Sequence, residues 1–127
     1  MSELTSREKA RIAAEAALER GAGDLVALHV RDVVSFADIF LICSGRADRQ
    51  VRAITDAIQE AVSQQGERPL GIEGYDEGRW VLIDLADVIV HVFQAEVRKH
   101  YDLERLWSDA PVLELGLPAD AGATVVR

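Results

Sequence analysis

The chain has 127 residues, a formal net charge of −8 and a hydrophobic content of 49%. This length supports one packed core and not two, and the composition is that of a folded protein rather than a disordered one. The acidic excess argues against a general affinity for nucleic-acid phosphates and suits a basic protein partner better. No apolar run approaches the roughly 20 residues of a membrane helix, so we expect a cytoplasmic protein without membrane contact.

The first part of the chain predicts one helix and two strands. The segment from Ser6 to about Arg20 is rich in strong helix formers, and Gly21 ends it. Residues 24–30 predict the first strand. Residues 37–43 form an apolar run interrupted only by Asp38, which favours a central strand buried on both faces. The single cysteine, Cys43, lies in this run and is expected to be an inert core thiol with no disulfide partner.

A second helix and a short strand follow. Residues 49–65 carry apolar side chains at intervals of three and four, which is typical of an amphipathic helix: Val51, Ile54, Ile58, Ala61 and Val62. Asp48 is expected to cap the start of this helix or to place a favourable charge there, and Gly66 ends it. Pro69 to Glu73 predict a short edge strand.

Two adjacent apolar runs, Trp80–Leu85 and Val88–Phe93, predict an antiparallel hairpin, because only two residues separate them. Side chains alternate across a strand, so the runs divide into two faces. One face is wholly aliphatic and is expected to be buried under helices: Val81, Ile83, Leu85, Val88, Val90 and Val92. The other is mixed and suits a surface that meets a partner: Trp80, Leu82, Asp84, Ile89, His91 and Phe93.

The region after the hairpin predicts one or two helical turns within residues 96–107. Two prolines and an Ala/Gly-rich stretch then favour a partly disordered tail over residues 109–127, which leaves a domain of residues 1–108. The order of the elements predicts an α/β or α+β sandwich, in which helices pack on a mixed sheet of about five strands.

Metal and nucleotide chemistry find little support in the sequence. None of the three histidines is spaced as a ligand pair with another histidine or with the cysteine, and we expect no bound metal and no cofactor. Ser44 and Gly45 precede a helix, but this is a common strand-to-helix turn rather than a phosphate-binding motif. Three aspartates could in principle hold a divalent ion, yet their spacing does not make them converge: Asp38, Asp84 and Asp87.

Aromatic and large apolar residues gather in one third of the chain, with a few charged or polar residues between them. This mixture is typical of an interface hot spot, although tryptophans that close the core would give the same composition. The candidate partner-binding residues are Trp80, Leu82, Asp84, His91, Phe93, Tyr101, Glu104, Leu106 and Trp107, with Glu73 and Tyr75 as lesser candidates at the rim.

Two stretches also resemble the ribosomal silencing factor, or Iojap-like, family. They are ADIFLICSGRADRQVRAI (Ala37–Ile54) and PLGIEGYDEGRWVLIDLADVIVHVFQAEVRKHYDLERLWSDAP (Pro69–Pro111). The resemblance implies a mixed sheet with helices that is similar to nucleotidyltransferases but lacks their catalytic residues. It therefore implies a protein that is not an enzyme.

The resemblance further implies a translational repressor. Such a protein would bind the large ribosomal subunit on its protein fourteen and sterically block joining with the small subunit under nutrient limitation. It would also form a homodimer off the ribosome, and it would bind no nucleic acid in a sequence-specific way. Two alternatives remain open: a nucleotidyltransferase-like nucleotide-binding protein that uses Ser44, Gly45 and the aspartates, and a pure dimerisation module.

Overall fold

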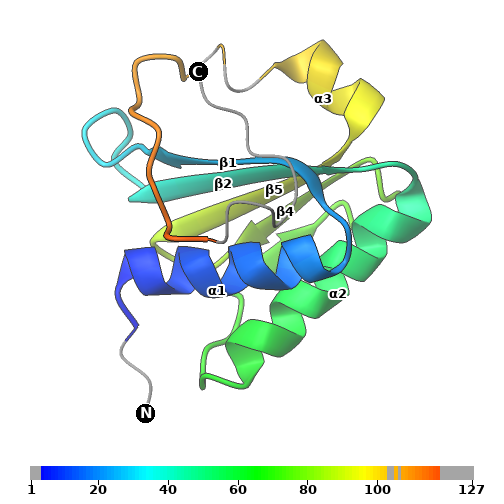
Figure 1. Cartoon of the computed structure of the whole chain (residues 1–127), viewed down its shortest axis with the longest axis horizontal. Coiled ribbons are helices and arrows are strands. Elements are labelled where there is room, and N and C mark those ends of the chain that lie inside the picture. Colours follow the sequence, from blue (N-terminus) through cyan, green and yellow to red (C-terminus); the bar gives the residue numbers. More distant parts are fainter. Residues whose placement is uncertain (1–3, 103–104, 106, 118–127) are drawn as a thin grey trace.

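A computed structural model describes residues 4–102, 105 and 107–117 of the chain (Figure 1). In this part of the chain three helices and five strands follow one another in the order α1 (Ser6–Glu19), β1 (Gly23–His29), β2 (Ile39–Gly45), α2 (Asp48–Ser63), β3 (Gly71–Glu73), β4 (Trp80–Asp84), β5 (Val88–Gln94) and α3 (Ala95–Tyr101). None of these helices is long and apolar enough to cross a lipid bilayer.

The five strands form one mixed sheet in the order β1-β2-β5-β4-β3. β2 and β5 are parallel, and the other three neighbouring pairs are antiparallel. The predicted α+β class, the mixed sheet of about five strands and the antiparallel hairpin of β4 and β5 are confirmed. The implied likeness to nucleotidyltransferases stays a prediction.

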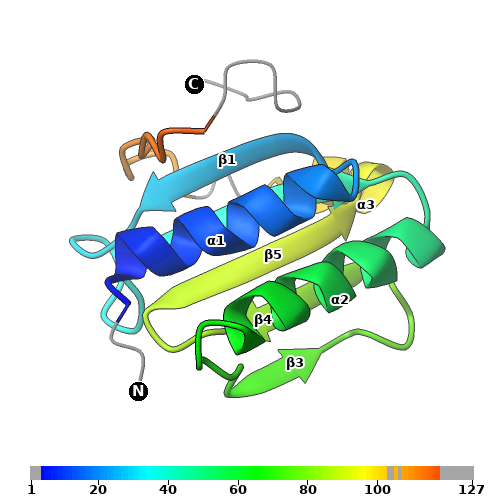
Figure 2. The same cartoon turned by 60° about the horizontal axis from the view of Figure 1, so that its bottom comes forward.

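Helices α1 and α2 cover one face of the sheet, while α3 lies on the other side (Figures 1 and 2). The aliphatic side chains of the hairpin are buried beneath α1 and α2, as predicted. Alanines let α1 approach the sheet closely, and four of them have no exposed surface: Ala10, Ala13, Ala14 and Ala17. Cys43 is buried in the same core, and burial raises the pKa of its thiol to about 12, which keeps it protonated and unreactive.

The two long helices begin differently. Thr5 caps α1 through a capping box, in which its hydroxyl accepts the N–H of Glu8 and the Glu8 carboxylate accepts the N–H of Thr5. Of the two roles predicted for Asp48, the favourable charge at the start of α2 is confirmed and the cap is not, because the capping position is Ala47. Asp48 instead lies in the first turn, where its charge is favourable and its carboxylate accepts the N–H of Arg49.

Lys9 connects α1 to the end of the sheet where β4 turns into β5. Its ammonium donates to the carbonyl of Leu85 at 3.0 Å and to the Asp87 carboxylate at 2.8 Å, and it lies 3.5 Å from a carboxylate oxygen of Glu67. Only 6% of Lys9 is exposed. This cation therefore joins the first helix, the turn between β4 and β5, and the segment that follows α2.

The segment after α3 closes one edge of the sheet. The N–H of His29 donates to the carbonyl of Pro111 at 2.9 Å, and the N–H of Leu113 donates to the carbonyl of Ala27 at 2.8 Å. Ala110 and Leu115 are buried. Residues 111–113 of the predicted tail thus lie along β1, while the proposed division of the chain at residue 108 stays a prediction.

Candidate functional site

The face of the sheet opposite α1 and α2 carries the mixed side chains of the hairpin. We call it the aromatic face and define it by Trp80, Leu82, Asp84, Ile89, His91 and Phe93 of the two strands together with Tyr101 of α3. Across the strands Trp80 pairs with Phe93, and the next outward-facing pair is Leu82 with His91. The predicted division of the hairpin between an aliphatic face and a mixed face is confirmed.

The aromatic face has an accessible layer and a buried layer. Trp80 and Leu82 are half-buried, and Tyr101 is 52% exposed. Phe93 has no exposed surface and His91 is only 5% exposed. Phe93 and His91 therefore lie beneath the surface and support the side chains above them. Trp80, Leu82 and Tyr101 can contact a partner directly.

The supports fix the orientation of Trp80. Its indole stacks on Phe93 with the ring centroids 4.8 Å apart, and Tyr101 packs against it at the same centroid distance. The indole N–H donates to Nδ1 of His91 at 3.2 Å. Contacts with two neighbouring aromatic rings and a hydrogen bond at the edge leave this large side chain little freedom to lose when a partner binds.

His91 is held neutral by its surroundings. Burial lowers the pKa of its imidazole to about 4, so the ring is uncharged at neutral pH. Because Nδ1 accepts the indole hydrogen bond, the ring proton belongs on Nε2. Nε2 is buried and has no hydrogen-bond partner within the described residues. His91 thus serves as a hydrogen-bond acceptor for Trp80, and no metal-ligand role is needed to explain its position.

Stability is expected to fall as the solution is acidified through the titration range of His91. The folded-state pKa of about 4 lies below the ordinary value of 6.5, so the unfolded chain binds a proton first. The contribution of neutral His91 to the free energy of unfolding should be complete above pH 6.5. The free energy of unfolding should then decrease by about 2 kcal/mol between pH 7 and pH 5. Urea unfolding at both pH values measures this. His91→Gln keeps an acceptor for Trp80 but does not titrate, and an equal loss in that variant would contradict the assignment.

The remaining predicted residues are distributed less compactly. Trp107 is half-buried over β2, where its ring meets Phe40 edge-on at a centroid distance of 5.7 Å. Asp84 is half-buried, and its carboxylate accepts the N–H of Ala86 in the turn between β4 and β5. Glu104 and Leu106 lie outside the described residues, so their predicted role stays a prediction.

The two lesser candidates lie on different sides of the sheet. Glu73 is exposed on β3 and pairs with Leu82, which places it at the rim of the aromatic face. Tyr75 instead turns toward α2, where its hydroxyl donates to the Asp56 carboxylate at 2.9 Å. That hydrogen bond raises the pKa of the Tyr75 hydroxyl. Tyr75 is therefore not part of the aromatic face.

Sequence reasoning missed two exposed apolar side chains in the connection between β1 and β2. Phe36 is 61% exposed and Val33 is 40% exposed. Phe36 lies against Phe40 with a centroid distance of 6.0 Å, so it extends the apolar surface beyond the hairpin. The available signal is a phenylalanine inside a segment of Asp, Ser and Val between the two predicted strands.

The aspartates proposed for a divalent ion are engaged elsewhere. Arg31 donates two hydrogen bonds to Asp38, and these lower the pKa of that carboxyl. Asp87 binds the ammonium of Lys9, and Asp84 shapes its own turn. Within the part of the chain that the structure describes, no group of three or more His, Cys, Asp or Glu side chains is placed to hold a metal ion.

Comparison with known proteins gives consistent matches over most of the chain. A family model described as "Ribosomal silencing factor during starvation" matches residues 3–124. The protein named ribosomal silencing factor RsfS of Halalkalibacterium halodurans is 42% identical over 112 residues, which are 88% of this chain and 96% of that protein. The protein of the same name from Bacillus subtilis is 46% identical over 105 residues, covering 83% and 89% of the two chains.

Solved structures show the same fold. A crystal structure of a Bacillus halodurans protein matches with a TM-score of 0.72 and 41% identity, and the alignment covers 81% of this chain and 93% of that one. A crystal structure of a Chromobacterium violaceum protein matches with a TM-score of 0.81 and 30% identity, over 92% of this chain and 97% of that one.

Proposed function

The chain belongs to the family of ribosomal silencing factors, and we propose that it represses translation by occupying the surface through which the large ribosomal subunit meets the small one. As a member of this family it is a regulator of translation and not an enzyme. The proposed docking site is protein fourteen of the large subunit, and the proposed condition is nutrient limitation. Because ribosomal subunits join in the cytoplasm, the proposal implies a cytoplasmic protein.

The observation that carries the proposal is the prearranged apolar surface made by Trp80, Leu82 and Tyr101. Aromatic side chains with a polar group dominate the binding energy of many protein interfaces, and they do so best when they are held rigid before binding. Here Trp80 is fixed by Phe93 below it and by the His91 hydrogen bond at its edge. A steric block requires only such a surface, without turnover.

Charge supports a protein partner rather than ribosomal RNA. The chain carries a net charge of −8, and acidic side chains stand at the rim of the aromatic face at Asp84 and Glu73. An acidic rim is repelled by phosphate backbones but is attracted to a basic ribosomal protein, which speeds the encounter. The apolar centre then limits dissociation.

We also propose that free copies of the chain form a homodimer through the same aromatic face. When the protein is off the ribosome this apolar surface is exposed to water, and the same surface of a second copy can cover it. The alternative of a nucleotidyltransferase-like enzyme gains no support from the aspartates, because Asp38 and Asp87 are bound to Arg31 and Lys9 respectively.

A subunit-joining assay tests the proposal. Purified small and large subunits are mixed with increasing amounts of the protein, and the joined ribosomes are separated on a sucrose gradient. We expect the joined fraction to fall and the protein to travel with the large subunit. If joining proceeds normally while the protein is saturating on the large subunit, the steric mechanism is wrong. If the protein binds neither subunit, the docking proposal is wrong as well.

A further inference from the structure

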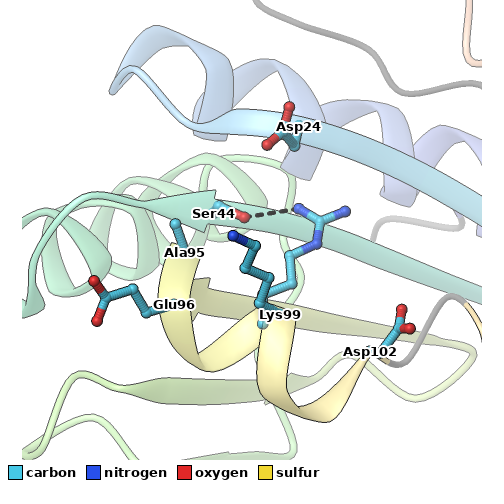
Figure 3. A pocket seen from close by; sticks show the side chains of 7 residues that line it. Asp24, Ser44, Ala95, Glu96, Lys99 and Asp102 are labelled. Atoms are coloured by element: carbon cyan, nitrogen blue, oxygen red, sulfur yellow. Dashed lines mark hydrogen bonds between the residues drawn. The ribbon is translucent and has the colours of Figure 1, made fainter.

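A pocket of about 460 Å³ opens at the end of the sheet where β2 and β5 finish and α3 begins (Figure 3). β2 and β5 are the parallel pair of the described sheet. Ligands of open α/β sheets bind outside the carboxyl ends of such strands, because the chain departs from each strand there and leaves a crevice. The residues that matter to the argument are Asp24, Ser44, Glu96, Arg98, Lys99 and Asp102.

Two cations and a hydroxyl form the wall of this pocket. Arg98 is only 7% exposed, and its guanidinium Nη1 donates to the Ser44 hydroxyl at 2.8 Å. The side chain of Lys99 rises from α3 toward Ser44 beside it (Figure 3). A planar guanidinium donor next to an ammonium and a hydroxyl matches the oxygens of a phosphoryl group.

Carboxylates surround the cations and restrict what the anion can be attached to. Asp24 lines the pocket from β1, while the carboxylates of Glu96 and Asp102 lie to either side, turned away from Ser44 (Figure 3). A second phosphate would meet these negative charges. Hydroxyl groups, in contrast, can donate hydrogen bonds to a carboxylate. The rim thus favours a single phosphate on a hydroxyl-bearing molecule over a polyphosphate or a nucleic-acid strand.

The backbone around the pocket is unusual in the same places. β1 has a register shift between Gly23 and Val26, and Asp24 within it has a φ of 48°. Asp102 on the opposite side has a φ of 51°. Within the described residues the other non-glycine residue with positive φ is Ala86. Bulges and left-handed residues often re-aim side chains at binding sites, and here they accompany two of the lining carboxylates.

We propose that this pocket binds a small phosphate monoester that carries hydroxyl groups, with Arg98, Lys99 and Ser44 on the phosphoryl oxygens and Asp24 on the hydroxyls. This site lies at the end of the sheet and uses none of the residues that define the aromatic face. The inference is independent of the proposed ribosome docking, and either can fail without the other.

Isothermal titration calorimetry with ribose 5-phosphate, inorganic phosphate and ribose tests the proposal on the full chain. We expect ribose 5-phosphate to bind more tightly than inorganic phosphate, and ribose to give no signal. Lys99→Gln should weaken ribose 5-phosphate about tenfold, the effect of losing one charge-assisted hydrogen bond. Arg7→Gln removes an exposed charge from α1, outside the pocket, and should bind as the parent does.

Lys99 is exposed, so its replacement should not disturb folding, which circular dichroism checks. Ser44→Ala is the second variant and should also weaken binding, because the phosphoryl group loses a hydroxyl donor. No binding of ribose 5-phosphate at millimolar concentration overturns the proposal. So does equal affinity in the parent and both folded variants, or tighter binding of a short oligoribonucleotide than of ribose 5-phosphate.

Discussion

Replacing Trp80 with alanine is expected to weaken binding to the large ribosomal subunit by about 30-fold or more, which is the effect of losing a hot-spot side chain. The expectation follows from the half-buried indole, which is oriented by the Phe93 stack and by the His91 hydrogen bond. Leu82→Ala should have a smaller effect in the same direction, because it removes less apolar surface from the adjacent position.

Co-sedimentation through a sucrose cushion at several protein concentrations measures this effect. The matched control is Tyr75→Ala, which also truncates a half-buried aromatic residue but on the side of α2. Leu70→Ala is the control for Leu82→Ala, since Leu70 is 73% exposed and lies outside the aromatic face. Circular dichroism confirms that each variant is folded. A folded Trp80→Ala, Leu82→Ala double variant that binds as tightly as the parent would place the ribosome contact elsewhere.

Replacing Lys9 with alanine is expected to lower the free energy of unfolding by about 3 kcal/mol. The substitution leaves the Asp87 carboxylate and the Leu85 carbonyl without their cation, and it also removes a buried aliphatic stem. The effect belongs to the lower end of the range for broken buried ion pairs, because Asp87 is 36% exposed and water can reach it.

Urea unfolding of the parent and of two further variants separates the charge from the packing. Lys9→Met keeps most of the stem and removes only the ammonium, so it should recover part of the loss. Arg7→Ala, on the exposed side of α1, should change the free energy of unfolding by less than about 0.5 kcal/mol. If Lys9→Ala and Arg7→Ala unfold at the same urea concentration, the interactions of Lys9 contribute nothing to stability.

The spacing of apolar residues predicted the strands and helices well, because each spacing found in this sequence fits one type of element. The two-residue spacing between Leu85 and Val88 permits a hairpin but no crossover, and the structure contains that hairpin. The three-and-four spacing along α2 buries Val51, Ile54 and Ile58 on the side that meets the sheet. The continuous apolar run of β2 is buried along its whole length.

The burial of individual side chains on the aromatic face was not predictable in the same way. Strand alternation places Trp80, Phe93 and His91 on one face, but it does not say what covers them. Phe93 is buried because Trp80 stacks over it and Tyr101 lies beside it, and these contacts depend on where α3 packs. For the same reason a side chain in a turn, such as Tyr75, could not be assigned to a face from its position in the chain.

The pocket at Ser44 was also hidden from sequence reasoning. Ser44 and Arg98 are separated by 54 positions, and only the parallel pairing of β2 with β5 brings them within hydrogen-bond distance. Ser44-Gly45 alone resembled an ordinary turn. The bulge that places Asp24 opposite them depends on how β1 pairs with β2, which the residues of β1 do not reveal.

The chain segment that lies along β1 has a consequence for self-association. The backbone groups of Ala27 and His29 that face outward from this edge are already bound by Leu113 and Pro111. At the opposite edge β3 is three residues long. An incoming strand thus finds little backbone to pair with, so the proposed homodimer has to form face to face. Dimer and ribosome would then compete for one surface, and a pool of dimers would act as a reserve that releases active monomer as free large subunits accumulate.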